Sequence, residues 1–259
     1  MERLEEVIVP RDHRFPLLDS DLHVLCVPSL RDELVEIYRT HDWVYDLVRE
    51  QSGVGELRGR HPVLTGEIGG RKIVAKRLFH GGSTARLWED RWLGPGRALD
   101  FVDAARHLYE HGIPTPELLF LSWIRRSGFV RVEIGFERLI GRDADHYFFE
   151  AATLPEDWRE KARKIGALAA SLHDSHFEHG DLNMMNIFFT EEGDIYILDL
   201  DKCELHDDEL DESTRIRNLS RLERSIRKQG RIHGYDHQLV DDMVKEVRSA
   251  YEESAEDRG

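Results

Sequence analysis

Three polar residues in the second half of the chain could together carry phosphoryl-transfer chemistry. Asp181 and Asn186 lie in the segment HGDLNMMN, residues 179–186, and Asp199 follows in the segment LDLD. Such chemistry needs a carboxylate that orients or deprotonates an acceptor hydroxyl, and hard oxygen ligands that hold Mg²⁺ against phosphates. We therefore predict Asp181 as the base, and Asn186 and Asp199 as Mg²⁺ ligands. The alternative is a surface loop whose Asp and Asn residues only form turns.

Phosphate binding also needs a cation and close backbone N–H groups, and the first half of the chain offers both. Gly53 and Gly55 frame Val54, and glycines let the backbone approach a phosphate closely. Lys76 ends the strand-like run IVAK, which matches the type of strand that presents a lysine to the α and β phosphates. Taken singly, these features indicate only a turn and an exposed strand lysine. Their order along the chain favours the phosphate site.

The elements that position these residues follow from the apolar pattern and the turn residues. A turn at Gly69-Gly70 is expected between the first two strands, and a hairpin turn at Glu192-Gly193 between residues 188–189 and 195–200. Strands are expected over 61–67, 71–78, 118–123 and 130–139. Helices are expected over 29–50, 97–110, 155–173, 215–231 and 238–251.

This order places most strands before most helices and predicts an α+β fold of two lobes with a hinge near residues 137–141. Residues 51–138 would form a lobe with an antiparallel sheet and one helix. Residues 139–259 would form a compact, mainly helical lobe. Residues 1–50 would be an N-terminal extension packed on the first lobe.

Composition excludes several classes of protein. The 259 residues include 51 acidic and 36 basic side chains, a net charge of −15, which argues against nucleic acid as the main partner. The apolar runs are too short for a membrane span, and the first residues lack the pattern of a secretory signal. Two cysteines are too few for a disulfide framework, so we expect a cytoplasmic protein.

Over residues 50–230 the chain resembles the lipopolysaccharide kinases of the protein-kinase-like superfamily, which phosphorylate 3-deoxy-D-manno-octulosonic acid (Kdo) or heptose, and most closely the Kdo kinases. The resemblance rests on the two segments above and on HGG, DRWL, GIPTP and the arginine-rich segment RNLSRLERSIRK, residues 217–228. It implies a two-lobed protein-kinase-like fold, with ATP as donor and Mg²⁺ as cofactor. Lys76, Gly53 and Gly55 would then bind the nucleotide.

The resemblance also implies an anionic glycolipid acceptor of the Kdo-lipid A type and peripheral contact with the cytoplasmic face of the inner membrane. Two departures from the wider kinase pattern matter. No Glu stands where one would pair with Lys76, because Phe101 occupies that place, with Asp100 and Asp103 as the nearest acids. Asp201, rather than Gly, follows Asp199-Leu200, which is the sugar-kinase pattern.

Several alternatives remain open. The arginine-rich helix could be a solvated helix that balances the acidic run before it, or a basic face toward an anionic acceptor or lipid head groups. Ile216, Leu219, Leu222 and Ile226 should form its apolar stripe. Heptose kinases, other small-molecule kinases and a partner-binding pseudokinase also fit in part. His173, His176 and His179 are spaced like zinc ligands, but hydrogen bonding of His173 and His179 to the loop is the favoured interpretation.

Overall fold

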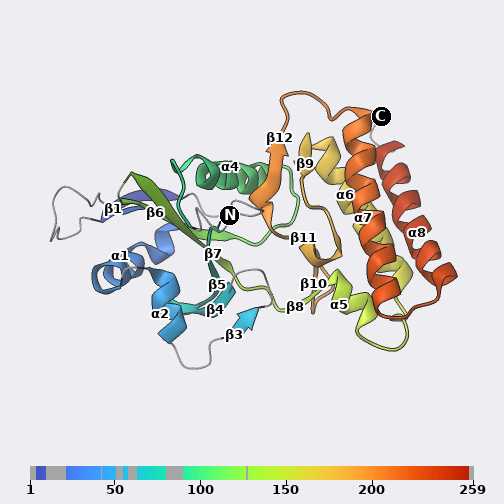
Figure 1. The fold of residues 1–259 in the computed structure, drawn as a ribbon, viewed down its shortest axis with the longest axis horizontal. Coiled ribbons are helices and arrows are strands. Elements are labelled where there is room, and N and C mark those ends of the chain that lie inside the picture. The colour runs from blue at the N-terminus through green and yellow to red at the C-terminus, as the bar shows by residue number, and fades with distance from the viewer. Residues whose placement is uncertain are drawn as a thin grey trace. The chain divides into compact units, whose positions relative to one another are not determined.

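The computed structural model describes residues 4–9, 22–41, 43–50, 55–57, 63–79, 90–126 and 128–256. The chain divides into two compact units. The first consists of Met1–Val102 and Pro116–Arg138, and the second of Asp103–Thr115 and Leu139–Gly259. Helix α4 (Gly96–Glu110) contributes residues to both units. Figure 1 labels the elements.

Antiparallel strands dominate the first unit. Its described strands form a sheet in the order β1-β2-β6-β7-β5-β4-β3. Their bounds are β1 (Glu5–Val9), β2 (Leu22–Cys26), β3 (Gly55–Leu57), β4 (Val63–Ile68), β5 (Arg71–Arg77), β6 (Leu118–Arg126) and β7 (Phe129–Glu137). The predicted turn between β4 and β5 is confirmed, since Gly69 and Gly70 both have positive φ, 57° and 73°. The predicted strands over 61–67, 71–78, 118–123 and 130–139 are confirmed within a few residues.

The prediction of one helix over residues 29–50 is wrong. A short 3-10 turn, η1 (Pro28–Leu30), leads into α1 (Arg31–Thr40), and a second helix, α2 (Val44–Glu50), follows. The chain turns because His41 is extended, with φ −122° and ψ 150°, and because the Thr40 hydroxyl donates to the helix carbonyls behind it. Strands β1 and β2, which the apolar pattern does not reveal, join the edge of the main sheet.

A buried carboxylate fastens α2 to this sheet. Glu133 of β7 is fully buried and accepts hydrogen bonds from the Val44 and Tyr45 N–H groups, at 2.9 and 3.0 Å, and from the Tyr38 hydroxyl, at 2.6 Å. Burial raises the pKa of Glu133, and these donors oppose that shift. The carboxylate therefore satisfies the first N–H groups of α2 in place of a local cap residue.

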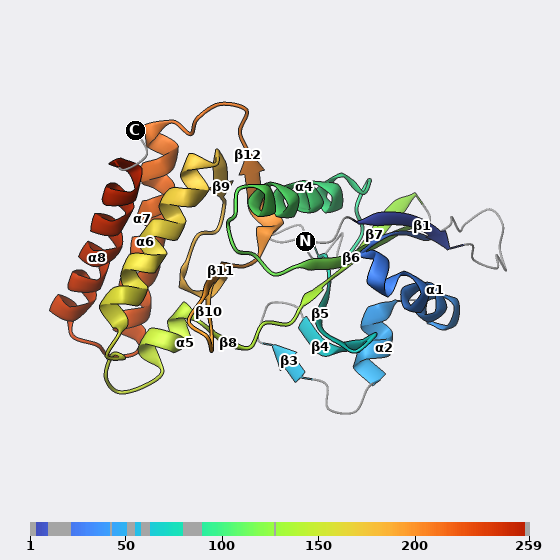
Figure 2. The same ribbon diagram turned by 180° about the vertical axis from the view of Figure 1, so that it is seen from behind.

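The second unit is built mainly from helices. Its described helices are α5 (Ala144–Phe149), α6 (Trp158–Asp174), α7 (Glu212–Ile232) and α8 (His237–Glu256). Helix α8 packs against both α6 and α7, and the three run side by side in both ribbon views (Figures 1 and 2). Along the part of the chain that is described, no helix is long and apolar enough to cross a membrane.

Short strands connect these helices. Strands β8 (Gly141–Asp143), β10 (Ile187–Thr190) and β11 (Ile195–Ile197) form one small antiparallel sheet, and β9 (Phe177–His179) pairs with β12 (Cys203–Leu205). The predicted hairpin is confirmed as β10 and β11, although β11 ends at Ile197 and not at residue 200. Short 3-10 turns, η2 (Met184–Asn186) and η3 (Leu200–Lys202), flank it.

One side chain of α7 that was predicted to be buried is exposed. Leu219, Leu222 and Ile226 are buried as expected, but Ile216 is 56% exposed. At 100° per residue, Ile216 lies roughly 90° around the helix from the centre of the other three, so it cannot face the same core. The helix begins at Glu212 because the Asp211 carboxylate accepts the N–H of Thr214 at 2.9 Å.

Candidate active site

A buried histidine organises the loop between β9 and β10. His179 has no exposed surface, and its Nδ1 accepts the N–H of Asp181 at 3.3 Å. Its Nε2 must therefore carry the proton, which it donates to the Leu198 carbonyl at 2.9 Å. Burial lowers the pKa of His179, which agrees with a neutral ring. This one side chain thus connects the residue before Asp199 to the backbone of Asp181.

Further hydrogen bonds bring the three predicted residues of the second unit together. The Asn186 amide donates to the Asp181 carbonyl at 2.8 Å, and the Leu198 N–H donates to the Asn186 carbonyl at 2.8 Å. Asn183 donates to the same Asp181 carbonyl at 2.7 Å. Asp181, Asn186 and the backbone that carries Asp199 therefore form one hydrogen-bonded cluster.

Asp199 has a left-handed backbone, with φ 58° and ψ 70°. Aspartate tolerates this region better than most residues, and non-glycine residues held there cluster at functional sites. The donor set fits a hard cation, because the Asn186 amide nitrogen is committed to Asp181 and its Oδ1 remains an acceptor, while Asp199 supplies a carboxylate. These two residues are the ones that would hold Mg²⁺.

Two cations flank the Asp181 carboxylate. Lys202 Nζ lies 3.8 Å from one carboxylate oxygen, and Arg221 Nε of α7 lies 3.4 Å from the other. Arg221 also donates to the Gly180 carbonyl, and the Gly180 N–H donates to the Lys202 carbonyl at 3.1 Å. A Cβ at position 180 would lie 2.1 Å from that Lys202 oxygen, so the two backbones meet only because residue 180 is glycine.

Helix α7 holds the loop through further polar contacts that the sequence did not reveal. Asn218 is buried, and its amide donates to the His179 carbonyl at 2.8 Å. Ser225 accepts the Met184 N–H at 3.2 Å. Polar residues on the inward face of an otherwise amphipathic helix are the only sequence signal for these contacts.

A second buried histidine supports Asn218. His173 of α6 donates through Nε2 to the Asn218 Oδ1 at 3.1 Å, while its Nδ1 accepts the Tyr251 hydroxyl of α8 at 2.9 Å. Burial lowers the pKa of His173, so the ring is neutral. The prediction that His173 and His179 support the loop through hydrogen bonds is confirmed. Among the described residues, no metal-ligand cluster includes His173, His176 or His179.

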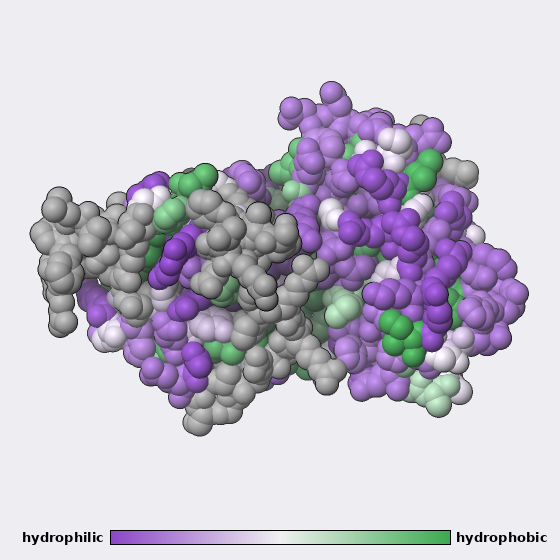
Figure 3. Space-filling view, viewed as in Figure 1, coloured by the Kyte–Doolittle hydropathy of each residue, from purple (hydrophilic) through white to green (hydrophobic). Residues whose placement is uncertain are grey.

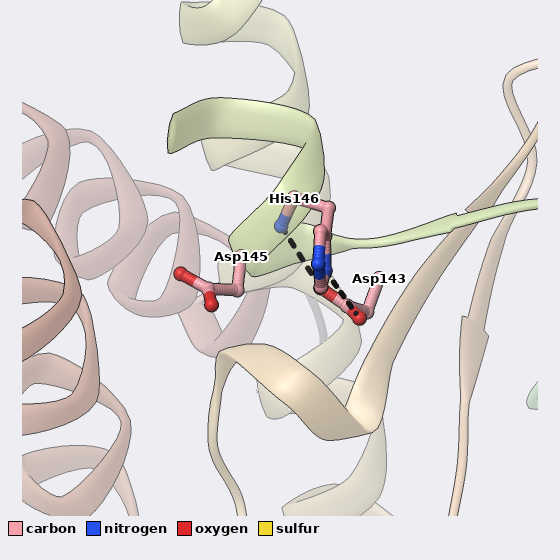
Figure 4. Close-up of side chains that lie close together, drawn as sticks. All are labelled: Asp143, Asp145 and His146. Atoms are coloured by element: carbon pink, nitrogen blue, oxygen red, sulfur yellow. Dashed lines mark hydrogen bonds and ion pairs between the residues drawn. The ribbon is translucent and has the colours of Figure 1, made fainter. Parts of the chain in front are cut away.

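Two candidate metal clusters occur among the described residues of the second unit. One consists of Glu178, Glu204 and His206 on and beside the β9–β12 pair. The other lies at the start of α5, and Figure 4 shows its three side chains. The Asp143 carboxylate caps α5 by accepting the His146 N–H at 2.9 Å, and it also contacts the His146 ring. That contact raises the pKa of His146. Asp145 points away from the other two, with its carboxylate 3.7 Å from His233 Nε2. These contacts account for the cluster as local structure.

The remaining candidates belong to the first unit. Lys76 lies in β5 opposite Ile134, and its ammonium is 5.6 Å from the ring centre of Phe101 and 5.8 Å from that of Phe136. Both distances allow cation–π attraction. Gly55 begins β3 and pairs with Thr65, whereas Gly53 lies outside the described residues.

The two acids considered as partners for Lys76 are both on α4. Asp100 is exposed, and Asp103 accepts a hydrogen bond from Arg106 at 2.6 Å, one turn along the same helix. The sequence names Asp100 and Asp103 only as the nearest acids, and neither is assigned to Lys76.

Comparison with known proteins identifies the group to which this chain is related. A model of the lipopolysaccharide kinase (Kdo/WaaP) family matches residues 47–251, a span that contains Lys76, the 179–186 loop and all of α7. The chain belongs to the lipopolysaccharide kinase family. This membership confirms the resemblance drawn from the sequence, and it makes the protein a phosphotransferase of lipopolysaccharide biosynthesis.

Three relatives of this lipopolysaccharide kinase are named 3-deoxy-D-manno-octulosonic acid kinase. A 3-deoxy-D-manno-octulosonic acid kinase of Xanthomonas oryzae pv. oryzae is 32% identical over 188 residues, which cover 70% of this chain and 71% of the relative. A Xanthomonas campestris pv. campestris protein of the same name is 31% identical over 60% of this chain and 61% of its own length. One from Haemophilus influenzae is 25% identical over 85% of this chain and 91% of the relative.

Proposed function

We propose that this lipopolysaccharide kinase transfers the γ-phosphoryl group of ATP to a hydroxyl of Kdo, in Kdo-lipid A or its precursor. The observation that carries the proposal is the hydrogen-bonded cluster in the second unit that joins Asp181, Asn186 and the backbone of Leu198, the residue before Asp199. The names of the relatives support Kdo as the acceptor sugar.

In this mechanism Asp181 is the catalytic base. Its carboxylate orients the acceptor hydroxyl and takes its proton as the new bond between oxygen and the γ-phosphorus forms. The bond from the γ-phosphorus to the β–γ bridging oxygen breaks, and ADP leaves. His179 and Asn186 contribute by fixing the backbone of Asp181, because displacement of a catalytic group by an ångström costs much of its rate enhancement.

The nucleotide would be bound by residues of both halves of the chain. Asn186 and Asp199 would hold Mg²⁺, which when bound neutralises charge on the phosphates. Lys76 would contact the α and β phosphates, and Gly53 and Gly55 would cover them. This arrangement requires a two-lobed protein-kinase-like fold, with residues 51–138 and 139–259 as the lobes and residues 1–50 packed on the first. The acceptor lipid would bring the enzyme to the cytoplasmic face of the inner membrane.

The test of the acceptor is phosphate transfer from labelled Mg·ATP to Kdo-lipid A, beside a heptosylated core acceptor and an unrelated protein. Selective labelling of Kdo-lipid A supports the proposal. Labelling of the heptosylated acceptor alone would assign the enzyme to heptose instead, and labelling of the protein alone would reject a sugar acceptor.

The test of the base is Asp181→Asn, which keeps the side-chain shape and removes the proton acceptor. We expect kcat to fall by about 10²–10⁴ with little change in ATP affinity. Asp208→Asn is the matched control, because Asp208 is an exposed acid that lies outside the cluster. Undiminished turnover of Asp181→Asn would remove Asp181 from the mechanism.

A further inference from the structure

Helix α7 is strongly basic in an acidic protein. Its 21 residues carry seven cations and two acids, whereas the whole chain has a net charge of −15. The two acids, Glu212 and Glu223, precede residue 224, so the helix from Arg224 to its end has no acidic residue. The cations are Arg215, Arg217, Arg221, Arg224, Arg227, Lys228 and Arg231.

Four of these cations have acidic partners inside the second unit. The nearest N–O distances are 3.2 Å for Arg215 with Asp174, 3.0 Å for Arg217 with Glu178, 3.4 Å for Arg221 with Asp181, and 3.0 Å for Arg227 with Asp241. The other three, Arg224, Lys228 and Arg231, are exposed, and within the described ranges no acid pairs with them.

These three cations, which we call the α7 basic face, project from one side of the helix. Spacings of four and three residues keep them within a narrow arc, and they extend over roughly 10 Å of helix length. The face of the second unit that Figure 3 draws is mostly hydrophilic, with separate hydrophobic patches. Helix α7 itself exposes two isoleucines, Ile216 and Ile232. The pocket of about 1250 Å³ in the second unit is lined by other residues, from the 111–114 segment, α6 and the β10–β11 hairpin among others.

We propose that the α7 basic face docks on an anionic lipid surface. A single small anion is best held by cations that converge in a hollow, whereas a convex row of cations matches a continuous layer of lipid phosphates. The net charge of −15 repels such a layer, so docking needs a local basic surface such as this face and should weaken as salt increases.

Under the proposed function, docking through this face would bring the catalytic loop close to a lipid-bound acceptor. On its inward side the same helix holds the loop, through Asn218 at the His179 carbonyl and Ser225 at the Met184 N–H. A lipid surface on the α7 basic face would therefore lie beside the loop that carries Asp181. Only this link between docking and catalysis rests on the proposed function, because binding to lipid can be measured without acceptor or ATP.

The test measures sedimentation of the full chain with vesicles of phosphatidylcholine containing about 30% phosphatidylglycerol, and with pure phosphatidylcholine vesicles. We expect binding to the anionic vesicles alone. The triple variant Arg224→Gln, Lys228→Gln, Arg231→Gln should lose about a hundredfold in partition, since each cation near an anionic surface contributes roughly a factor of five.

The matched control removes three cations from other helices, as Arg159→Gln, Lys164→Gln and Lys245→Gln, and should bind nearly as the parent does. The double variant Arg224→Lys, Arg231→Lys keeps the charge and should also bind. Equal binding to both kinds of vesicle, no binding of the parent, or equal losses in both triple variants would overturn the proposal. If the parent binds vesicles yet phosphorylates no sugar acceptor, the proposed function fails while the docking face stands.

Discussion

Replacement of Asn218 by Leu tests whether α7 holds the catalytic loop. Leu has a similar size, so it leaves no large cavity, but it removes the acceptor of the His173 Nε2–H and the donor to the His179 carbonyl. Both histidines are fully buried, so water cannot replace the lost partners. The His179 carbonyl keeps the Leu182 N–H at 3.1 Å, so the His173 Nε2–H is the group left unpaired. An unpaired buried polar group costs about 1–3 kcal/mol, which is the loss expected in the free energy of unfolding.

The loss would be measured by urea denaturation followed by circular dichroism. Lys228→Leu is the matched control on the exposed side of α7, and its stability should stay within about 0.5 kcal/mol of the parent. Because Asn218 also positions the loop, kcat should fall at least tenfold. This is measured without denaturant, at a temperature where the variant remains folded. A loss below about 0.5 kcal/mol together with unchanged kcat would refute this account of α7.

Two further predictions concern buried ionisable groups. Burial lowers the pKa of His179, so the folded state keeps it neutral while the unfolded chain takes up a proton below the ordinary value of 6.5; its stabilising contribution is complete above that pH and declines below it. The stability gap between the parent and His179→Gln should therefore narrow between roughly pH 7.5 and 5.5, and parallel pH curves would contradict this. In the first unit, Glu133→Gln should lower the free energy of unfolding by about 1–3 kcal/mol, because an amide has one acceptor oxygen where the carboxylate has two. That one oxygen cannot accept from all four donors, Tyr38, Ser122, Val44 and Tyr45. The exposed substitution Glu36→Gln is its control, and equal denaturation midpoints for the two variants would argue against the fastening role of Glu133.

The sequence predicted those elements whose apolar pattern and turn residues lie within the element itself. The hairpin after Asn186 and the turn at Gly69-Gly70 depend on apolar alternation and turn glycines, and both are present. The 29–50 helix failed because its break depends on an extended His41 and on a carboxylate from a distant strand, Glu133. No window of sequence around residue 41 contains that carboxylate.

In the candidate site, too, local sequence predicts some features, whereas others depend on tertiary packing. The spacing of Asp181, Asn186 and Asp199 is visible in one stretch of sequence, and the structure gathers their backbones. The arginine-rich helix, in contrast, could be described only as a basic helix with two possible roles. That Arg221 would lie against Asp181, and that Asn218 would hold the His179 carbonyl, depends on how α7 packs across the unit, which helical periodicity does not encode.

The close approach of Gly180 to the Lys202 carbonyl has an evolutionary consequence. Even alanine would bring a methyl carbon to 2.1 Å from that oxygen, so replacement would force two segments apart rather than merely stiffen one. Selection at this position would therefore act against every side chain alike, whatever its polarity. Drift of the enzyme toward new acceptors would have to proceed at neighbouring positions while this point of contact stayed unchanged.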